Sequence, residues 1–184
     1  MTPPTYAFKE WSAVVQALGA GEQILLLRKG GIAEGRGGFQ IRADAFWLFP
    51  TAFHAQREKT KPSAAKWFSS PPPVENELRL EYSAKIVKST FVTDWSTVQA
   101  LDPYHIWTMD TVRERFNWSK PPGVHALVLR IYKTGTPVVL PLTPEMAGCK
   151  SWVEVPAALE TYPSSPVLSE ANFAAKRAPL DLLL

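Results

Sequence analysis

Two residues that could work as an acid-base pair lie within residues 22–57. His54 follows the apolar run Phe46–Phe49, and Glu34 lies in the glycine-rich loop between that run and an earlier one, Ile24–Leu27. If the two runs pair as a hairpin, His54 and Glu34 meet at one end of the sheet, as a general base meets the carboxylate that orients it. This arrangement predicts a small hydrolase. No motif supplies a nucleophile and a lone histidine is more often structural, so a structural role for His54 stays open.

Cations precede the same glycine-rich loop. Arg28 and Lys29 are followed by five glycines within residues 30–38. Glycines let backbone N–H groups approach an anion, and the two cations would add charge, so the pattern predicts an anion-binding loop. The spacing matches neither a phosphate-binding loop nor a dinucleotide fingerprint. A hairpin loop that needs glycine for its positive φ angles is therefore the alternative.

A third candidate combines aromatic rings with cations. His105 and Trp107 precede a segment that carries Arg113 and Arg115, and Trp118 follows. Single-stranded nucleic-acid binders use this combination, because bases stack on aromatic faces while arginines contact phosphates. The alternative is that Trp107 and Trp118 are packing residues, as most of the seven tryptophans must be.

Composition and residue spacing limit which kinds of binding site and which cell compartment are expected. Lys plus Arg is 20 and Asp plus Glu is 17, which gives a formal charge of +3 and no general excess of basic residues. The three dispersed histidines have no zinc-ligand spacing, so no metal site is expected, and no motif identifies a cofactor. Cys149 is the single cysteine, which agrees with a reducing compartment and predicts a cytoplasmic location. No apolar run approaches the roughly 20 residues that span a bilayer, so no membrane association is expected.

Strands are expected from short or alternating apolar runs. The two-residue period places Trp47 and Phe49 on one face of their strand and Phe46 and Leu48 on the other, both covered. Pro50 should end that strand. The expected strands are 24–27, 46–49, 78–93, 124–132 and an edge strand at 137–142.

Helices are expected where apolar residues recur at helical spacing after a capping residue. The expected helices run from Phe8 to Leu18, from Thr93 or Asp94 through Leu101, from Thr108 or Asp110 through Phe116, for one turn after Thr143, and after Ser169. Helix and strand alternate without a regular βαβ rhythm. The sequence thus predicts a single α+β domain over residues 1–155, a mixed or barrel-like sheet flanked by short helices, with a C-terminal extension containing a short helix over 156–184.

Several short segments of the sequence are distinctive when taken together. They are KEW at 9–11, LLLRKGGIAE at 25–34, FWLFPTAFH at 46–54, HIWT at 105–108, RF at 115–116 and GCKSWVE at 148–154. In these segments the chain resembles a bacterial family catalogued only as a domain of unknown function. The resemblance runs from Phe8 to about Glu154 and implies a single domain, but it supplies no activity.

Two functions follow from the candidate residues. The leading hypothesis is a cytoplasmic module that binds an anionic ligand, nucleic acid or a nucleotide, through Arg28, Lys29, His105, Trp107, Arg113 and Arg115. The alternative is a small hydrolase of a phosphodiester or nucleotide that uses His54 and Glu34. The two differ in whether the chain shows turnover or only ligand retention that falls with salt.

Overall fold

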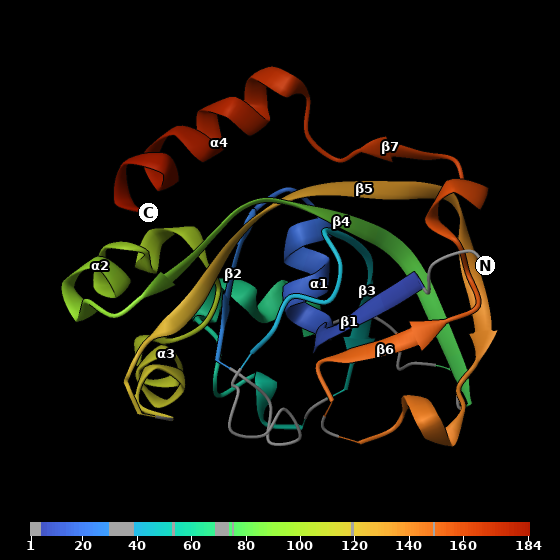
Figure 1. The fold of residues 1–184 in the computed structure, drawn as a ribbon, viewed down its shortest axis with the longest axis horizontal. Coiled ribbons are helices and arrows are strands. Elements are labelled where there is room, and N and C mark those ends of the chain that lie inside the picture. The colour runs from blue at the N-terminus through green and yellow to red at the C-terminus, as the bar shows by residue number, and fades with distance from the viewer. Residues whose placement is uncertain are drawn as a thin grey trace.

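The strands form one mixed sheet that curls into a half-barrel (Figure 1). The computed structural model describes residues 5–29, 39–52, 54–68, 74, 76–118, 120–148 and 150–184, with His54 described by its backbone alone. The strands are β1 (Thr5–Trp11), β2 (Leu25–Arg28), β3 (Ala45–Thr51), β4 (Glu77–Val92), β5 (Val124–Pro141), β6 (Trp152–Val155) and β7 (Ser164–Pro166). The α+β class predicted from the sequence is confirmed.

Within the sheet, the strand order is β2-β5-β4-β3-β1-β6, and β7 pairs with β5 beside this path. Only β1 and β3 run parallel; the other pairs are antiparallel. Since parallel strands end at the same edge, the last residues of β1 and β3 lie together, with Trp11 opposite Thr51. This edge of the sheet carries the candidate site.

Apolar residues cover both faces of the sheet. Phe46 and Leu48 pack in the larger core cluster, whereas Trp47 and Phe49 pack in a second, smaller cluster. All four side chains are buried. The alternation predicted for this strand is therefore confirmed, and β3 separates the two cores.

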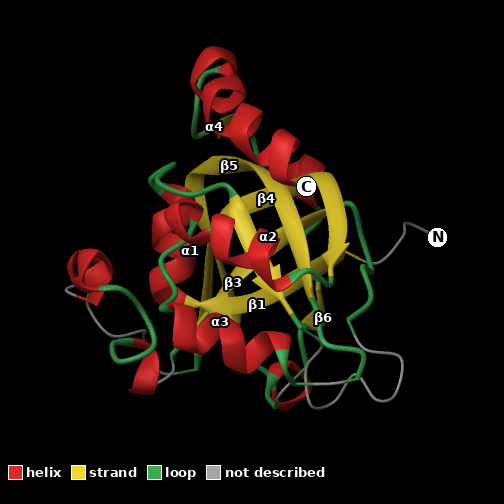
Figure 2. Ribbon diagram, turned by 90° about the vertical axis from the view of Figure 1, so that its left-hand side faces the viewer, coloured by secondary structure: helices red, strands yellow, loops and turns green. Residues whose placement is uncertain are grey.

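In the described part of the chain, four α-helices and several short 3₁₀ turns surround the sheet (Figure 2). They are α1 (Ser12–Gly19), α2 (Trp95–Ala100), α3 (Met109–Phe116) and α4 (Glu170–Leu183), with 3₁₀ turns at His54–Gln56, Pro62–Phe68, Asp102–Tyr104, Pro144–Met146 and Leu159–Thr161. Side-chain caps begin three of the helices, because Asp94, Thr108 and Ser169 each accept a hydrogen bond from a backbone N–H of the first turn. These caps decide the two open choices in favour of Asp94 and Thr108.

Three predictions for the N-terminal half of the chain differ from the structure. The helix expected from Phe8 begins only at Ser12, because residues 5–11 form β1 between β3 and β6. Pairing on both sides outweighs a helical spacing that only five apolar residues define. The predicted hairpin is also wrong, since β2 pairs with β5 while β3 pairs with β4 and β1. Pro50 does not end its strand, which continues to Thr51.

The two strands expected at 124–132 and 137–142 are one strand, β5. Its register against β4 jumps from Lys133 opposite Tyr82 to Val138 opposite Leu80. The residues between form an irregular bulge in which Pro137 needs no ladder hydrogen bond. The segment predicted at 137–142 is therefore the end of β5 and not a separate strand. Its residues Val138–Pro141 pair with β4 on one side, and no pairing among the described strands occupies their other side.

The last thirty residues contribute to the same sheet and core. β7 pairs with residues Tyr132–Thr134 of β5. Phe173 and Leu180 of α4 are buried in the larger core cluster, and Arg130 of β5 lies 2.6 Å from Glu170. The C-terminal segment thus packs as part of the half-barrel.

Candidate anion-binding site

The carboxyl ends of β1 and β2 bring a carboxylate and a guanidinium together. Glu10 is the penultimate residue of β1 and Arg28 is the last of β2. Arg28 Nη1 lies 3.7 Å from Glu10 Oε2, and Arg28 Nη2 donates a 2.6 Å hydrogen bond to Ser151 Oγ just before β6. The Phe8 ring lies 5.1 Å from the guanidinium carbon. These contacts fix Arg28 between β1 and the start of β6.

A second guanidinium reaches this place from α3. Arg115 Nη1 donates a 2.8 Å hydrogen bond to Leu27 O, one residue before Arg28. Its guanidinium lies 4.5 Å from the Trp107 ring centroid and 4.9 Å from that of Trp11. Glu10, Arg28, Arg115 and Ser151 are called the arginine cluster below.

Electrostatics in the arginine cluster favour an anion. Burial lowers the pKa of Arg115 to about 10, the nearby Glu10 carboxylate raises it and Arg28 lowers it. A group with this pKa stays protonated at neutral pH. Two guanidiniums therefore face one carboxylate, an excess of one positive charge.

Two polar atoms of the cluster lack a hydrogen bond within the described part of the chain. Glu10 Oε2 and Arg28 Nε are buried and make no hydrogen bond to any described residue. A guanidinium has five N–H donors, and the hydrogen bonds of the described residues use one from Arg28 and one from Arg115. Buried donors without partners cost free energy, so the cluster has capacity for a ligand with several acceptor oxygens.

Lys29 adds a further cation close by. Its ammonium donates hydrogen bonds to the carbonyl oxygens of Gly123 (3.0 Å) and Phe116 (3.3 Å), and lies 3.4 Å from that of Pro121. Burial lowers the pKa of Lys29. These carbonyls tie the end of β2 to the end of α3, so Lys29 also has a structural role.

The His105 to Arg115 segment divides into buried and exposed parts. Trp107 is completely buried and His105 nearly so, and Arg115 covers the Trp107 ring. Trp107 therefore offers no face for a stacking base, and the packing alternative describes it. Arg113 is exposed above Trp95, at 4.7 Å from the ring centroid, and Trp118 is 61% exposed. A stacking surface on this side would use Trp118.

The chain matches one family model, described as Domain of unknown function (DUF1802), over residues 7–179. The chain belongs to the DUF1802 family. No curated protein matches it, and no solved structure does. The match covers the arginine cluster, β7 and most of α4, and so extends past Glu154, where the resemblance was expected to end.

The predicted pair of His54 and Glu34 cannot be measured in this DUF1802 domain. Glu34 lies outside the described residues, and only the backbone of His54 is described. That backbone begins a 3₁₀ turn three residues after Thr51, whose hydroxyl donates a 3.0 Å hydrogen bond to Glu10 O. His54 thus follows the strand end that lies beside Glu10.

Two residues of the arginine cluster were missed in the sequence. Glu10 and Ser151 lie in the segments KEW and GCKSWVE, which were noted for their resemblance and not for chemistry. No local motif marks these two residues. Each lies at the end of a strand, and the pairings of β1 bring those strand ends next to Arg28. The described part of the DUF1802 domain has no group of three metal-ligating side chains, and none of its helices is long and apolar enough to cross a membrane.

Proposed function

We propose that this DUF1802 domain binds the phosphate group of a nucleotide or nucleic acid at the arginine cluster. The observation that carries the proposal is the convergence of Arg28 and Arg115 on one buried carboxylate, with donors left over. Lys29 brings the nearby formal charge to three cations against Glu10, or 3 − 1 = +2.

Phosphate fits this cluster better than a simple halide would. Guanidinium groups donate two parallel hydrogen bonds to phosphate or carboxylate oxygens, so two of them define an orientation as well as a charge. The rings of Phe8, Trp11 and Trp107 hold the two groups in place before binding. Such preorganisation reduces the entropy lost on binding. The Arg28 side chain is 18% exposed, so an anion can reach it from solvent.

Binding of a longer single strand is the more specific form of the proposal. Arg113 and Trp118 are exposed and flank the end of α3, whose Arg115 belongs to the cluster. A strand anchored by one phosphate at the cluster could stack a base on Trp118 and place another phosphate on Arg113. The expected compartment remains the cytoplasm.

The test uses a fluorescein-labelled single-stranded oligonucleotide, with inorganic phosphate and AMP as competitors. Arg28→Lys keeps the charge but removes the planar fork, so affinity should fall about tenfold. Arg79→Lys is the matched control, because Arg79 is exposed on β4 and pairs with Glu81. Anisotropy at two salt concentrations should give weaker binding at high salt. The proposal would be refuted if wild type did not bind at low ionic strength, if its binding did not weaken at high salt, or if the two variants had equal affinities.

Arg113→Ala separates the single-strand form from simple phosphate binding. It should weaken oligonucleotide binding and reduce its salt dependence while leaving competition by AMP unchanged. Replacing Arg115 is a poor probe of binding alone, because its guanidinium covers Trp107 and its loss would also lower stability.

A phosphodiester or nucleotide hydrolase is the second candidate, and the Glu10 carboxylate beside Arg28 favours it. Glu10 Oε2 is a buried carboxylate oxygen without a hydrogen-bond partner among the described residues. It could accept the proton of a water that attacks phosphorus while the arginines stabilise the developing charge. His54, as first predicted, would act from the adjoining strand end. Turnover of bis(p-nitrophenyl) phosphate that is lost in both Glu10→Gln and His54→Ala, with folding retained, would support hydrolysis; no turnover by wild type would exclude this substrate class.

A further inference from the structure

The outer edge of β6 has backbone groups that no described strand pairs with. β6 is the last of the described strands in the sheet, and among them it pairs only with β1. Lys9 N donates a 2.8 Å hydrogen bond to Ser151 O, and the antiparallel register repeats this bonded position at Val153. Bonded positions alternate in antiparallel pairs, so Trp152 and Glu154 direct their N–H and C=O groups away from β1. Among the described residues, no strand other than β1 pairs with β6, and no backbone hydrogen bond of a turn or loop uses these four groups.

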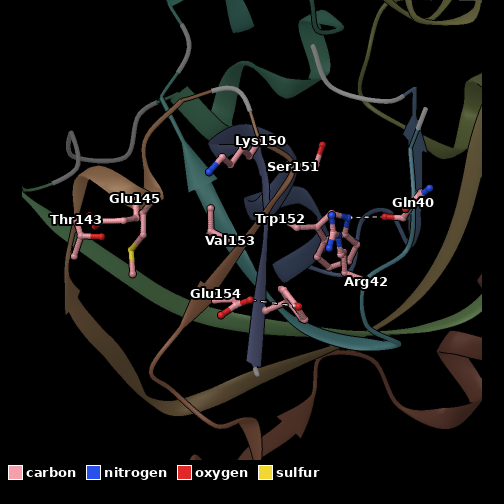
Figure 3. Close-up of a pocket in the computed structure, with 11 residues that line it drawn as sticks. Gln40, Arg42, Thr143, Glu145, Lys150, Ser151, Trp152, Val153 and Glu154 are labelled. Atoms are coloured by element: carbon pink, nitrogen blue, oxygen red, sulfur yellow. Dashed lines mark hydrogen bonds between the residues drawn. The ribbon is translucent and has the colours of Figure 1, made fainter. Parts of the chain in front are cut away.

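A groove of about 540 Å³ follows this edge. In Figure 3, Gln40 and Arg42 lie on one side of β6, and Thr143 and Glu145 lie on the other. Trp152 is fixed on the first side, because its indole N–H donates a 2.8 Å hydrogen bond to Gln40 O. The free strand edge therefore lies at the base of a groove with two walls.

The charges of the groove differ from those of the arginine cluster. Arg42 and Lys150 are balanced by Glu145 and Glu154, so the lining has no net formal charge. A polyanion gains little from such a surface, whereas a polypeptide with side chains of both signs is complementary to it. The backbone of a polypeptide also supplies the donors and acceptors that a strand edge requires.

We propose that an extended peptide segment of a partner protein, carrying side chains of both charge signs, adds a strand to β6 in this groove. Its backbone pairs with the outward groups of Trp152 and Glu154, and its charged side chains contact Arg42, Lys150, Glu145 and Glu154. A second copy of the domain would bring its own walls against those of the groove, which makes it the less suitable occupant.

The test begins with phage-displayed linear heptapeptides selected on the full chain. Synthetic copies of the selected peptides are then titrated against wild type and two variants by fluorescence anisotropy. Glu154→Pro removes an outward N–H that β1 does not use, so the sheet is kept while binding should weaken at least about tenfold. Glu154→Gln keeps that N–H and should have a smaller effect. Thermal unfolding checks that both variants fold.

Peptide chemistry gives a readout that does not depend on folding of a variant. Alternate backbone N–H groups of an added strand point toward β6, so N-methylation of one alternate set should abolish binding to wild type. N-methylation of the other set should leave most of the binding. Failure to select peptides, equal binding to Glu154→Pro, or equal effects of the two N-methylated sets would overturn the proposal. Sedimentation velocity that shows a wild-type dimer lost in Glu154→Pro would assign the edge to a second copy instead, which also overturns it.

Discussion

His105 should make the stability of this domain depend on pH between 6.5 and about 4. Its ring is buried beside Trp107. Burial lowers its pKa from 6.5 to about 4, and the Lys61 ammonium adds to this effect. The folded chain therefore leaves His105 neutral where the unfolded chain protonates it.

The sign and size of the contribution of His105 to the free energy of unfolding follow from proton linkage. The unfolded state binds the extra proton below pH 6.5, so the contribution of His105 to stability is complete above that pH and is lost as pH falls toward 4. At 1.36 kcal/mol for each pH unit, the shift from 6.5 to about 4 corresponds to roughly 3 kcal/mol. About 2 kcal/mol of this loss should occur between pH 7 and pH 4.5.

Urea unfolding of wild type and His105→Phe at several pH values measures this contribution. The variant keeps a planar ring in the buried site but cannot titrate. Carboxylates titrate equally in both proteins, so the difference between their free energies of unfolding isolates His105. Parallel pH dependence of the two proteins would refute the assignment of a buried, neutral histidine.

Two further predictions use matched pairs of variants, both measured by chemical denaturation. Gly21→Ala should destabilise by about 2–3 kcal/mol, because φ is +69° and the new Cβ would lie 2.6 Å from Leu168, whereas Gly148→Ala, with φ of +79° and open space, should cost about 1 kcal/mol. Equal losses would contradict the crowding at Gly21. Leu180→Ala should cost about 2–4 kcal/mol, while Leu182→Ala, at an 89% exposed position of the same helix, should change stability by less than about 0.5 kcal/mol. If Leu180→Ala left the free energy of unfolding unchanged, α4 would not be part of the core.

Local signals in the sequence predicted local structure. The caps at Asp94 and Thr108 and the alternation of Trp47 and Phe49 depend on neighbours within one turn or one strand, and the structure has them as expected. Pairing partners were not predictable in this way. β2 and β3 are both short buried strands, and nothing within either run specifies β5 or β1 as its neighbour.

The prediction of the candidate site was limited in the same way, because it depends on which strands pair. Arg28 and Arg115 were chosen for their charge, and the structure brings them together. Their carboxylate partner was not found, because Glu10 was assigned to a helix and its position at a strand end depends on β1 pairing with β3 and β6. The burial of Trp107 likewise depends on Arg115 lying over its ring, which no spacing reveals.

The pairing of β1 with β6 has a consequence for how the chain is made. Tyr6 and Glu154 are 148 residues apart in sequence, yet they are opposite each other in the sheet. A ribosome releases the N-terminal strand long before its partner exists, so one side of β1 stays unpaired during most of synthesis. Contacts between such distant residues also close slowly, because a long loop must be ordered first. The half-barrel should therefore be completed only after Trp152–Val155 have left the ribosome, and the β6 side of β1 is open to chaperones or to misassociation until then.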